Sequence, residues 1–136
     1  LNLGDLNKAA KAPILLNNTG NNDFDQINIT GAALIGVTTP SETILASSFF
    51  VNITNGTAGA GLALSNSPQV LPGIGDTANA TLLHGPGAVG DAPYVGTADS
   101  LTRGNQTLVF WVDVPSTGLS AQTYNNTWNL TVVDLS

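Results

Sequence analysis

Large apolar side chains occupy every second position in the segment 108–114 of this chain. Leu108, Phe110, Val112 and Val114 share one parity, and the residues between them share the other. Because successive side chains of a β-strand point to opposite faces, this pattern predicts a strand with one face in the core. Shorter apolar segments follow, with turn residues about every ten positions. We therefore expect an all-β fold, an antiparallel β-sandwich.

Further strands are predicted on both sides of a looser middle. We expect them at about 13–17, 24–37 with breaks at Gly31 and Gly36, 43–53 and 123–135. Residues 55–103 are rich in glycine and predict only short edge strands, at 62–64, 70–71 and 81–83, between long loops. A chain of 136 residues that is 42% hydrophobic can form one core. The predicted organisation is a tail over 1–12 and a single sandwich domain over 13–136.

Asn-x-Thr sequons, the acceptor sites of N-glycosylation, are unusually frequent in this chain. Their number favours dense glycosylation of an extracellular, cell-surface protein. The alternative is that Asn and Thr simply suit the turns and strands of a β-rich sequence. The eight candidate sites are Asn17, Asn28, Asn52, Asn55, Asn79, Asn105, Asn125 and Asn129.

Strand parity favours glycosylation over that alternative. Asn28 lies between Ile27 and Ile29, and Asn52 lies between Val51 and Ile53, so the asparagines occupy the face opposite to the aliphatic residues. The same holds near the end of the chain. There the apolar residues lie on the face opposite to Asn125 and Asn129, and they are Tyr124, Trp128, Leu130 and Val132. The sequons are thus predicted on the solvent face, where a bulky glycan fits.

The charge and cysteine content exclude several classes of function. The net charge is −6, and the only cations are Lys8, Lys11 and Arg103, which argues against nucleic-acid and anionic-membrane partners. The absence of cysteine excludes disulfides and thiolate metal sites. The sequence contains no run of 18 apolar residues, so no membrane span is predicted. Because the sequence begins at Leu1 rather than Met, we interpret it as a mature form whose secretion signal has been removed.

The first twelve residues differ from the rest of the chain. Leu1, Leu3 and Leu6 are apolar, and they are followed by an Ala- and Lys-rich piece, 7–12, which fits a linker or a short helical stretch. An apolar tail on an acidic sandwich is what the donation of a strand to a neighbouring copy requires. The alternative is that the tail pairs with its own sheet or frays.

Four segments carry a resemblance to a known family. They are 13–24 (PILLNNTGNNDF), 108–115 (LVFWVDVP), 118–124 (GLSAQTY) and 128–132 (WNLTV). They resemble subunits of archaeal bundling pili and surface threads, relatives of the bacterial TasA and camelysin biofilm-matrix family. The shared signatures are an N-x-G-N turn after the first core strand and a P-x-x-G-x-x-A-x-x-Y turn before the closing strand.

The resemblance implies a jelly-roll-like sandwich that polymerises by N-terminal donor-strand complementation. The product would be an extracellular pilus or thread for adhesion or biofilm formation. By position, the donor strand and subunit interface would contain Leu1, Leu3 and Leu6, with residues 8–12 as the connector. The partner would be the chain itself, as a homopolymer.

Catalysis and cofactors find little support in the residues. The only histidine, His84, precedes Gly-Pro-Gly, and no serine lies in a Gly-x-Ser-x-Gly elbow, so we predict no catalytic residues and no enzyme. The stretch 21–25 (NNDFD) has oxygen ligands that would suit Ca²⁺, but turn formation explains the same residues, and we predict no metal or cofactor.

Two hypotheses remain open from the sequence. The first is the glycosylated filament subunit. The second is a carbohydrate-binding or adhesion module of a larger surface protein, for which Trp111 is the one supporting residue, because its parity is opposite to that of Phe110.

Overall fold

The computed structural model describes residues 1–17, 26–52, 61–71 and 105–133, which form eleven short strands and one 3-10 turn. The order along the chain is β1 (Lys8–Ala9), β2 (Ile14–Asn17), β3 (Gln26–Thr30), β4 (Leu34–Gly36), β5 (Thr43–Ile44), η1 (Ala46–Ser48), β6 (Phe49–Asn52), β7 (Leu62–Ala63), β8 (Gln69–Val70), β9 (Asn105–Val112), β10 (Tyr124–Asn125) and β11 (Asn129–Val133).

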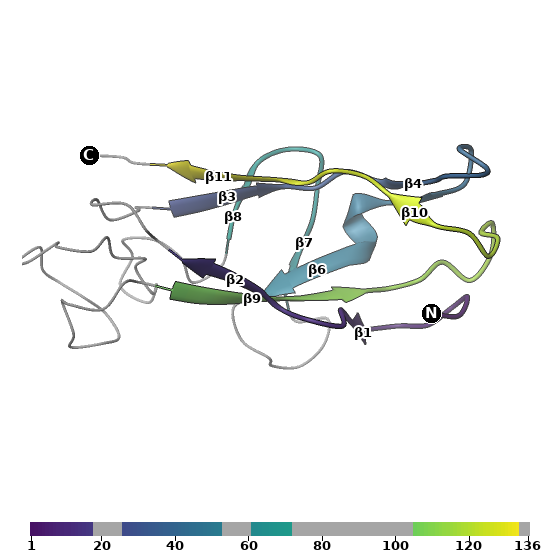
Figure 1. Cartoon of the computed structure of the whole chain (residues 1–136), viewed down its shortest axis with the longest axis horizontal. Helices are drawn as coiled ribbons and strands as arrows, with labels where there is room; N and C mark the ends of the chain where they lie inside the picture. Colours follow the sequence, from purple (N-terminus) through teal and green to yellow (C-terminus); the bar gives the residue numbers. More distant parts are fainter. Residues whose placement is uncertain (18–25, 53–60, 72–104, 134–136) are drawn as a thin grey trace, which may run out of the picture.

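The strands form two layers, and within each layer the paired strands are antiparallel (Figure 1). In one layer, β1 and β2 both pair with β9, which pairs with β6, and β6 pairs with β7. The other layer holds two three-stranded sheets, β11-β3-β8 and β10-β4-β5. The fold is therefore the all-β antiparallel sandwich that the alternation predicted.

The core lies between the layers, and the long strand β9 supplies much of it. Leu108, Phe110 and Val112 on β9 and Val114 just after it are all buried, as their shared parity predicted. From the opposite layer, β3 contributes two isoleucines at 3% and 1% exposure. Each fully buried aliphatic side chain of this kind stabilises the fold by about 1.5–3 kcal/mol.

The prediction of one continuous strand over 43–53 is wrong within the described residues, because the chain changes layers there. β5 pairs with β4 in one layer, whereas β6 pairs with β9 in the other. Between them, Ala46–Ser48 form a 3-10 turn, and Ala46 is 5% exposed. A strand that crosses from one sheet to another must bend, and this turn provides the bend.

The last predicted strand is also divided, into β10 and β11. β11 pairs with β3 and β10 pairs with β4, so this break lies opposite the break between β3 and β4. The break between β3 and β4 is the one expected at Gly31. Two side chains replace the missing ladder bonds. Asn126 Nδ2 donates to the carbonyl oxygen of Ala33 at 2.7 Å, and Trp128 Nε1 donates to that of Ala32 at 2.8 Å.

Gly31 is buried at this break because the neighbouring loop approaches its backbone closely. Its N–H donates to the Ser65 carbonyl at 2.8 Å, and a Cβ on Gly31 would lie only 2.9 Å from Leu64 Cβ.

Strands β7 and β8 match the short edge strands expected in the middle of the chain, whereas 81–83 lies outside the described residues. The described part of the chain contains no helix long and apolar enough to cross a membrane.

Candidate functional site

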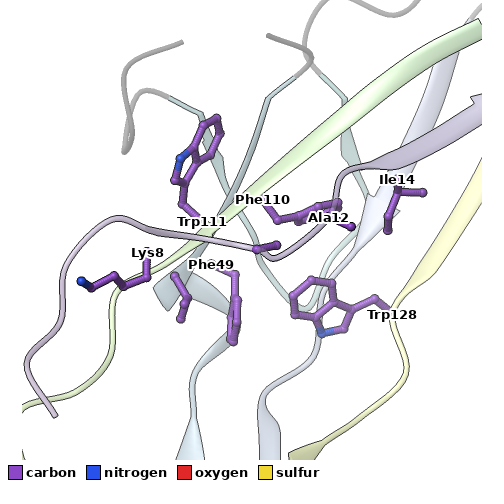
Figure 2. Close-up of a pocket in the computed structure, with 9 residues that line it drawn as sticks. Lys8, Ala12, Ile14, Phe49, Phe110, Trp111 and Trp128 are labelled. Atoms are coloured by element: carbon purple, nitrogen blue, oxygen red, sulfur yellow. The ribbon is translucent and has the colours of Figure 1, made fainter. Parts of the chain in front are cut away.

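An apolar groove opens at the edge of the sandwich, under the connector between β1 and β2. Its volume is about 260 Å³. Figure 2 shows that its walls come from this connector, from β9 and β6, and from the segment before β11. Aliphatic and aromatic groups form nearly all of the surface. The lining residues are Lys8, Ala10, Ala12, Ile14, Phe49, Phe110, Trp111, Val112 and Trp128.

Trp128 forms one wall of the groove and is fixed by contacts on several sides. Its ring meets Phe49 edge-on, with centroids 4.9 Å apart, and lies 5.9 Å from the ring of Phe110. The hydrogen bond from its indole nitrogen to Ala32 sets the orientation of the ring. The wall is therefore preorganised, which reduces the entropic cost of binding an apolar group against it.

Beyond the groove, apolar side chains are also exposed on β2 and β11, which are edge strands of the two layers, and we call this edge of the sandwich the seam. These two strands run in the same direction in opposite layers (Figure 1). Leu130 and Val132 are opposite Ile29 and Ile27 in the ladder and so share their inner face, as predicted. Yet Leu130 is 42% exposed and Val132 is 46% exposed, as is Ile14. The interior face of the sandwich is therefore incompletely covered at this edge.

The N-terminal tail lies along the end of β9 in this single chain. The Asp5 carbonyl accepts from the N–H of Val114 at 2.7 Å, and β1 is a strand of only two residues where a linker or short helical stretch was expected. This docking leaves nearly the whole tail exposed, including its three leucines. Leu1, Leu3 and Leu6 are 83%, 53% and 66% exposed.

Trp111, the residue that supports a carbohydrate-binding module, is only 3% exposed. In Figure 2 it extends away from Phe49 and Phe110, in keeping with its opposite parity. A ring must present an accessible face to stack on a sugar. Trp111 therefore offers no open platform for a sugar in this structure.

The sequons of β3 and β11 are neighbours across the ladder. Asn129 is opposite Thr30, and Thr131 is opposite Asn28, so the acceptor of each sequon faces the threonine of the other. This places both asparagines on the outer face, with Asn129 exposed and Asn28 half-buried. Two N-linked glycans on these residues would stand side by side over this strand pair.

The remaining sequons are distributed over both layers. Asn125 on β10 is exposed, and Asn52 on β6 is half-buried and pairs with Val109. The backbones of Asn17 and Asn105 are directly opposite each other on β2 and β9, while their side chains are not described. Asn55 and Asn79 lie outside the described residues.

A polar cluster that the sequence analysis did not identify surrounds the only glutamate of the chain, Glu42. Its Oε2 accepts four hydrogen bonds at 2.7 Å: from the Tyr124 hydroxyl, from the Ser120 hydroxyl and N–H, and from Gln122 Nε2. The other end of the Gln122 amide accepts from the backbone N–H groups of Thr38 and Thr39 at 2.8 and 2.9 Å. The cluster thus joins the β4–β5 turn to the loop before β10.

These donors stabilise the ionised form of Glu42. The hydrogen bond from Tyr124, followed by those from Ser120 and then from Gln122, lowers the pKa of Glu42 from 4.5 to about 2, although desolvation opposes the shift. The donors come from the P-x-x-G-x-x-A-x-x-Y segment that carries the family resemblance. The only glutamate of the chain was the available signal in the sequence, but it lies 78 to 82 positions before its donors, and nothing indicated that they would meet.

The part of the chain that is described contains no candidate metal centre. Within it, no group of three or more His, Asp or Glu side chains could hold a metal ion. His84 and the calcium candidate at 21–25 lie outside the described residues. The features that remain are the apolar groove, the exposed tail leucines and the outward sequons.

Comparison with known proteins found no match: no protein-family model, no curated protein and no solved structure resembles the chain significantly.

Proposed function

We propose that this chain is the structural subunit of an extracellular, N-glycosylated filament, in which the tail of one copy completes the sandwich of the next. The filament would be a pilus or thread that serves adhesion or biofilm formation, and its partner is the chain itself. The observation that carries the proposal is the presence of two uncovered apolar surfaces on the same chain. Leu1, Leu3 and Leu6 are exposed at one end of the chain, and an apolar groove is unfilled at the edge of the same sandwich.

Strand donation would bury both surfaces, because the leucines of one copy would enter the groove of the next. Leucines that leave water gain about 1.5–3 kcal/mol each when fully buried, and the groove and seam are apolar enough to accept them. The tail's own docking is shallow, because its only strand, β1, has two residues. Releasing it from its own β9 edge would therefore cost few backbone bonds, and the same bonds could form with a neighbour.

The sequon positions are compatible with assembly through the groove. Asn28 and Asn129 lie on the outer face of their sheet, whereas the ring of Trp128, which forms one wall of the groove, packs against the core residues Phe49 and Phe110. Glycans on the outer face would leave the groove open. A chain with only 9% charged residues also benefits from such hydrophilic cover.

A complementation experiment tests the proposal. The triple variant with Leu1, Leu3 and Leu6 changed to Asn lacks a donor, and Ala12→Trp fills the groove and so lacks an acceptor. We expect each variant alone to remain monomeric, while a mixture forms a 1:1 complex in which the intact tail of one enters the intact groove of the other. Sedimentation and electron microscopy measure the two outcomes.

Leu15→Asn is the matched control, because Leu15 is 63% exposed on β2 and is not a groove residue. This variant should form filaments as the wild type does. Wild-type chains that stay monomeric at high concentration, or donor-deficient chains that still form filaments, would refute the proposal.

A carbohydrate-binding or adhesion module is the second candidate from the sequence. It requires a stable monomer that binds a glycan, and the burial of Trp111 removes the residue that favoured it.

A further inference from the structure

Strand β11 is the longest edge strand among the described residues. It has five residues, and it pairs with β3 on one side only in this part of the fold. The first four of its residues are exposed. An edge strand of this kind presents unpaired N–H and C=O groups, on which a strand from another copy can add.

The sequence of β11 lacks the usual protection against such pairing. Natural edges are blunted by Lys, by Pro, by bulges or by short length. β1 carries Lys8, and Pro13 interrupts the path from β1 to β2, while Pro68 precedes the two-residue strand β8. β11, in contrast, contains Leu130, Val132 and Val133, and no charged residue occurs anywhere in 114–133.

β11 carries a sequon instead of a charge. Asn129 begins the strand, is exposed and lies on the outer face, and Asn125 on the preceding edge strand β10 is exposed as well. We propose that an N-linked glycan on Asn129 protects the open edge of β11 against pairing with other copies of the chain. This inference rests on the N-glycosylation in the proposed function.

The physical reason is steric and hydrophilic exclusion. An added strand would lie about 4.8 Å from β11, with its side chains next to those of Asn129. A glycan at that position occupies the same space and brings its own hydration. Self-association through the β11 edge is thereby suppressed, and contact between copies is restricted to other surfaces.

Cross-strand neighbours allow a matched test. Thr131→Ala and Thr30→Ala each remove one sequon by the same substitution, but the first acts on the edge strand and the second on the central strand β3. Thr131→Ser retains the sequon. Thr131→Lys removes it and supplies a charge to the edge instead.

All four variants are produced in a host that glycosylates Asn-x-Thr sites, in the donor-deficient background with Leu1, Leu3 and Leu6 changed to Asn. Assembly through the tail is thereby removed, so lateral association can be measured alone. Mass spectrometry gives the occupancy of Asn129, and sedimentation velocity gives the size of the particles. We expect Thr131→Ala to associate into larger particles and the other three variants to remain monomeric.

The remaining outcomes overturn the inference. It fails when wild-type Asn129 carries no glycan, or when Thr131→Ala loses the glycan and stays dispersed. It fails equally when Thr131→Lys or Thr30→Ala associates as Thr131→Ala does, since edge pairing is then not the cause. Failure of the proposed polymerisation is recognised separately, by wild-type chains that form no filaments, and leaves this comparison intact.

Discussion

The hydroxyl of Tyr124 donates a 2.7 Å hydrogen bond to Oε2 of Glu42, across 82 positions of sequence. It joins β10 to the segment that leads into β5, and Gln122 and Ser120 bond to the same oxygen. A single ionised oxygen therefore organises one end of the sandwich, because four donors converge on it.

Acidification should weaken this end of the fold through Glu42. Its folded-state pKa of about 2 lies below the ordinary value of 4.5, so the carboxylate stabilises the fold above about pH 4.5, and this stabilisation is lost as the pH falls toward 2. We expect Glu42→Gln to be less stable than wild type at pH 7, with the difference shrinking toward pH 2. Urea unfolding midpoints of both proteins across this range measure the effect, and a difference independent of pH would contradict it.

Removal of the Tyr124 hydroxyl should reduce the same dependence on pH. Tyr124→Phe retains the ring but removes the largest contribution to the lowered pKa of Glu42. The pKa of Glu42 should rise toward 4.5, so the acid-induced loss of stability should be smaller than in the wild type and should be complete at a higher pH. NMR titration of the Glu42 carboxyl is the direct measurement. An unchanged titration curve would show that the other donors suffice.

Trp128→Phe should separate the hydrogen bond of this tryptophan from its packing. A phenyl ring can still contact Phe49, but it cannot donate to the Ala32 carbonyl, and we expect a loss of about 1–3 kcal/mol in the free energy of unfolding. Trp128→Leu should cost more, because it also removes the aromatic contacts. Unfolding can be followed by the fluorescence of Trp111. Equal stability of Trp128→Phe and wild type would exclude a structural role for the indole nitrogen.

The strand pattern was predictable from the sequence wherever a strand has one buried face. On β9 the parity of Leu108, Phe110 and Val112 identified the core side, and the residues flanking Asn28 did so on β3. Parity also placed Leu130 on the inner face correctly, but it did not indicate that this side chain is 42% exposed. Exposure depends on what the opposite layer covers, and that is a property of the tertiary structure.

The breaks and the polar cluster required the structure. The bend at Ala46–Ser48 exists because β5 and β6 belong to different layers, and the local sequence is compatible with a continuous strand. Glu42 meets its donors only because the β4–β5 turn and the loop before β10 lie together. Neither long-range relationship leaves a periodic signal in the sequence.

Leu108→Ala and Leu130→Ala compare one substitution at a closed and an open part of the same core. Leu108 is fully buried, so its truncation should cost about 2–5 kcal/mol in the free energy of unfolding. Leu130 borders the open seam, where water already reaches the side chain, and its truncation should cost less than about 1.5 kcal/mol. Chemical denaturation of the monomeric, donor-deficient form measures both. Similar losses would mean that the seam is covered in solution.

Gly31→Ala tests whether the break between β3 and β4 depends on the close approach of the neighbouring loop. The added Cβ would lie 2.9 Å from Leu64 Cβ and 3.3 Å from both Ala46 Cβ and the Ser65 carbonyl oxygen. Leu64 and Ala46 are buried, so neither can move away easily, and we expect a loss of about 1–3 kcal/mol.

The control for this substitution is Gly118→Ala, at a turn with φ of +80° and no atom near the new Cβ. There only backbone strain opposes the methyl group, at about 1 kcal/mol. The two variants are distinguished by a second substitution, Leu64→Gly, which removes the Cβ that the new methyl group would meet beside Gly31. In the Gly31→Ala background Leu64→Gly should cost less than in the wild type, whereas in the Gly118→Ala background the two costs should add. Additive costs at both glycines would place the strain at Gly31 in the backbone rather than in the contact with Leu64.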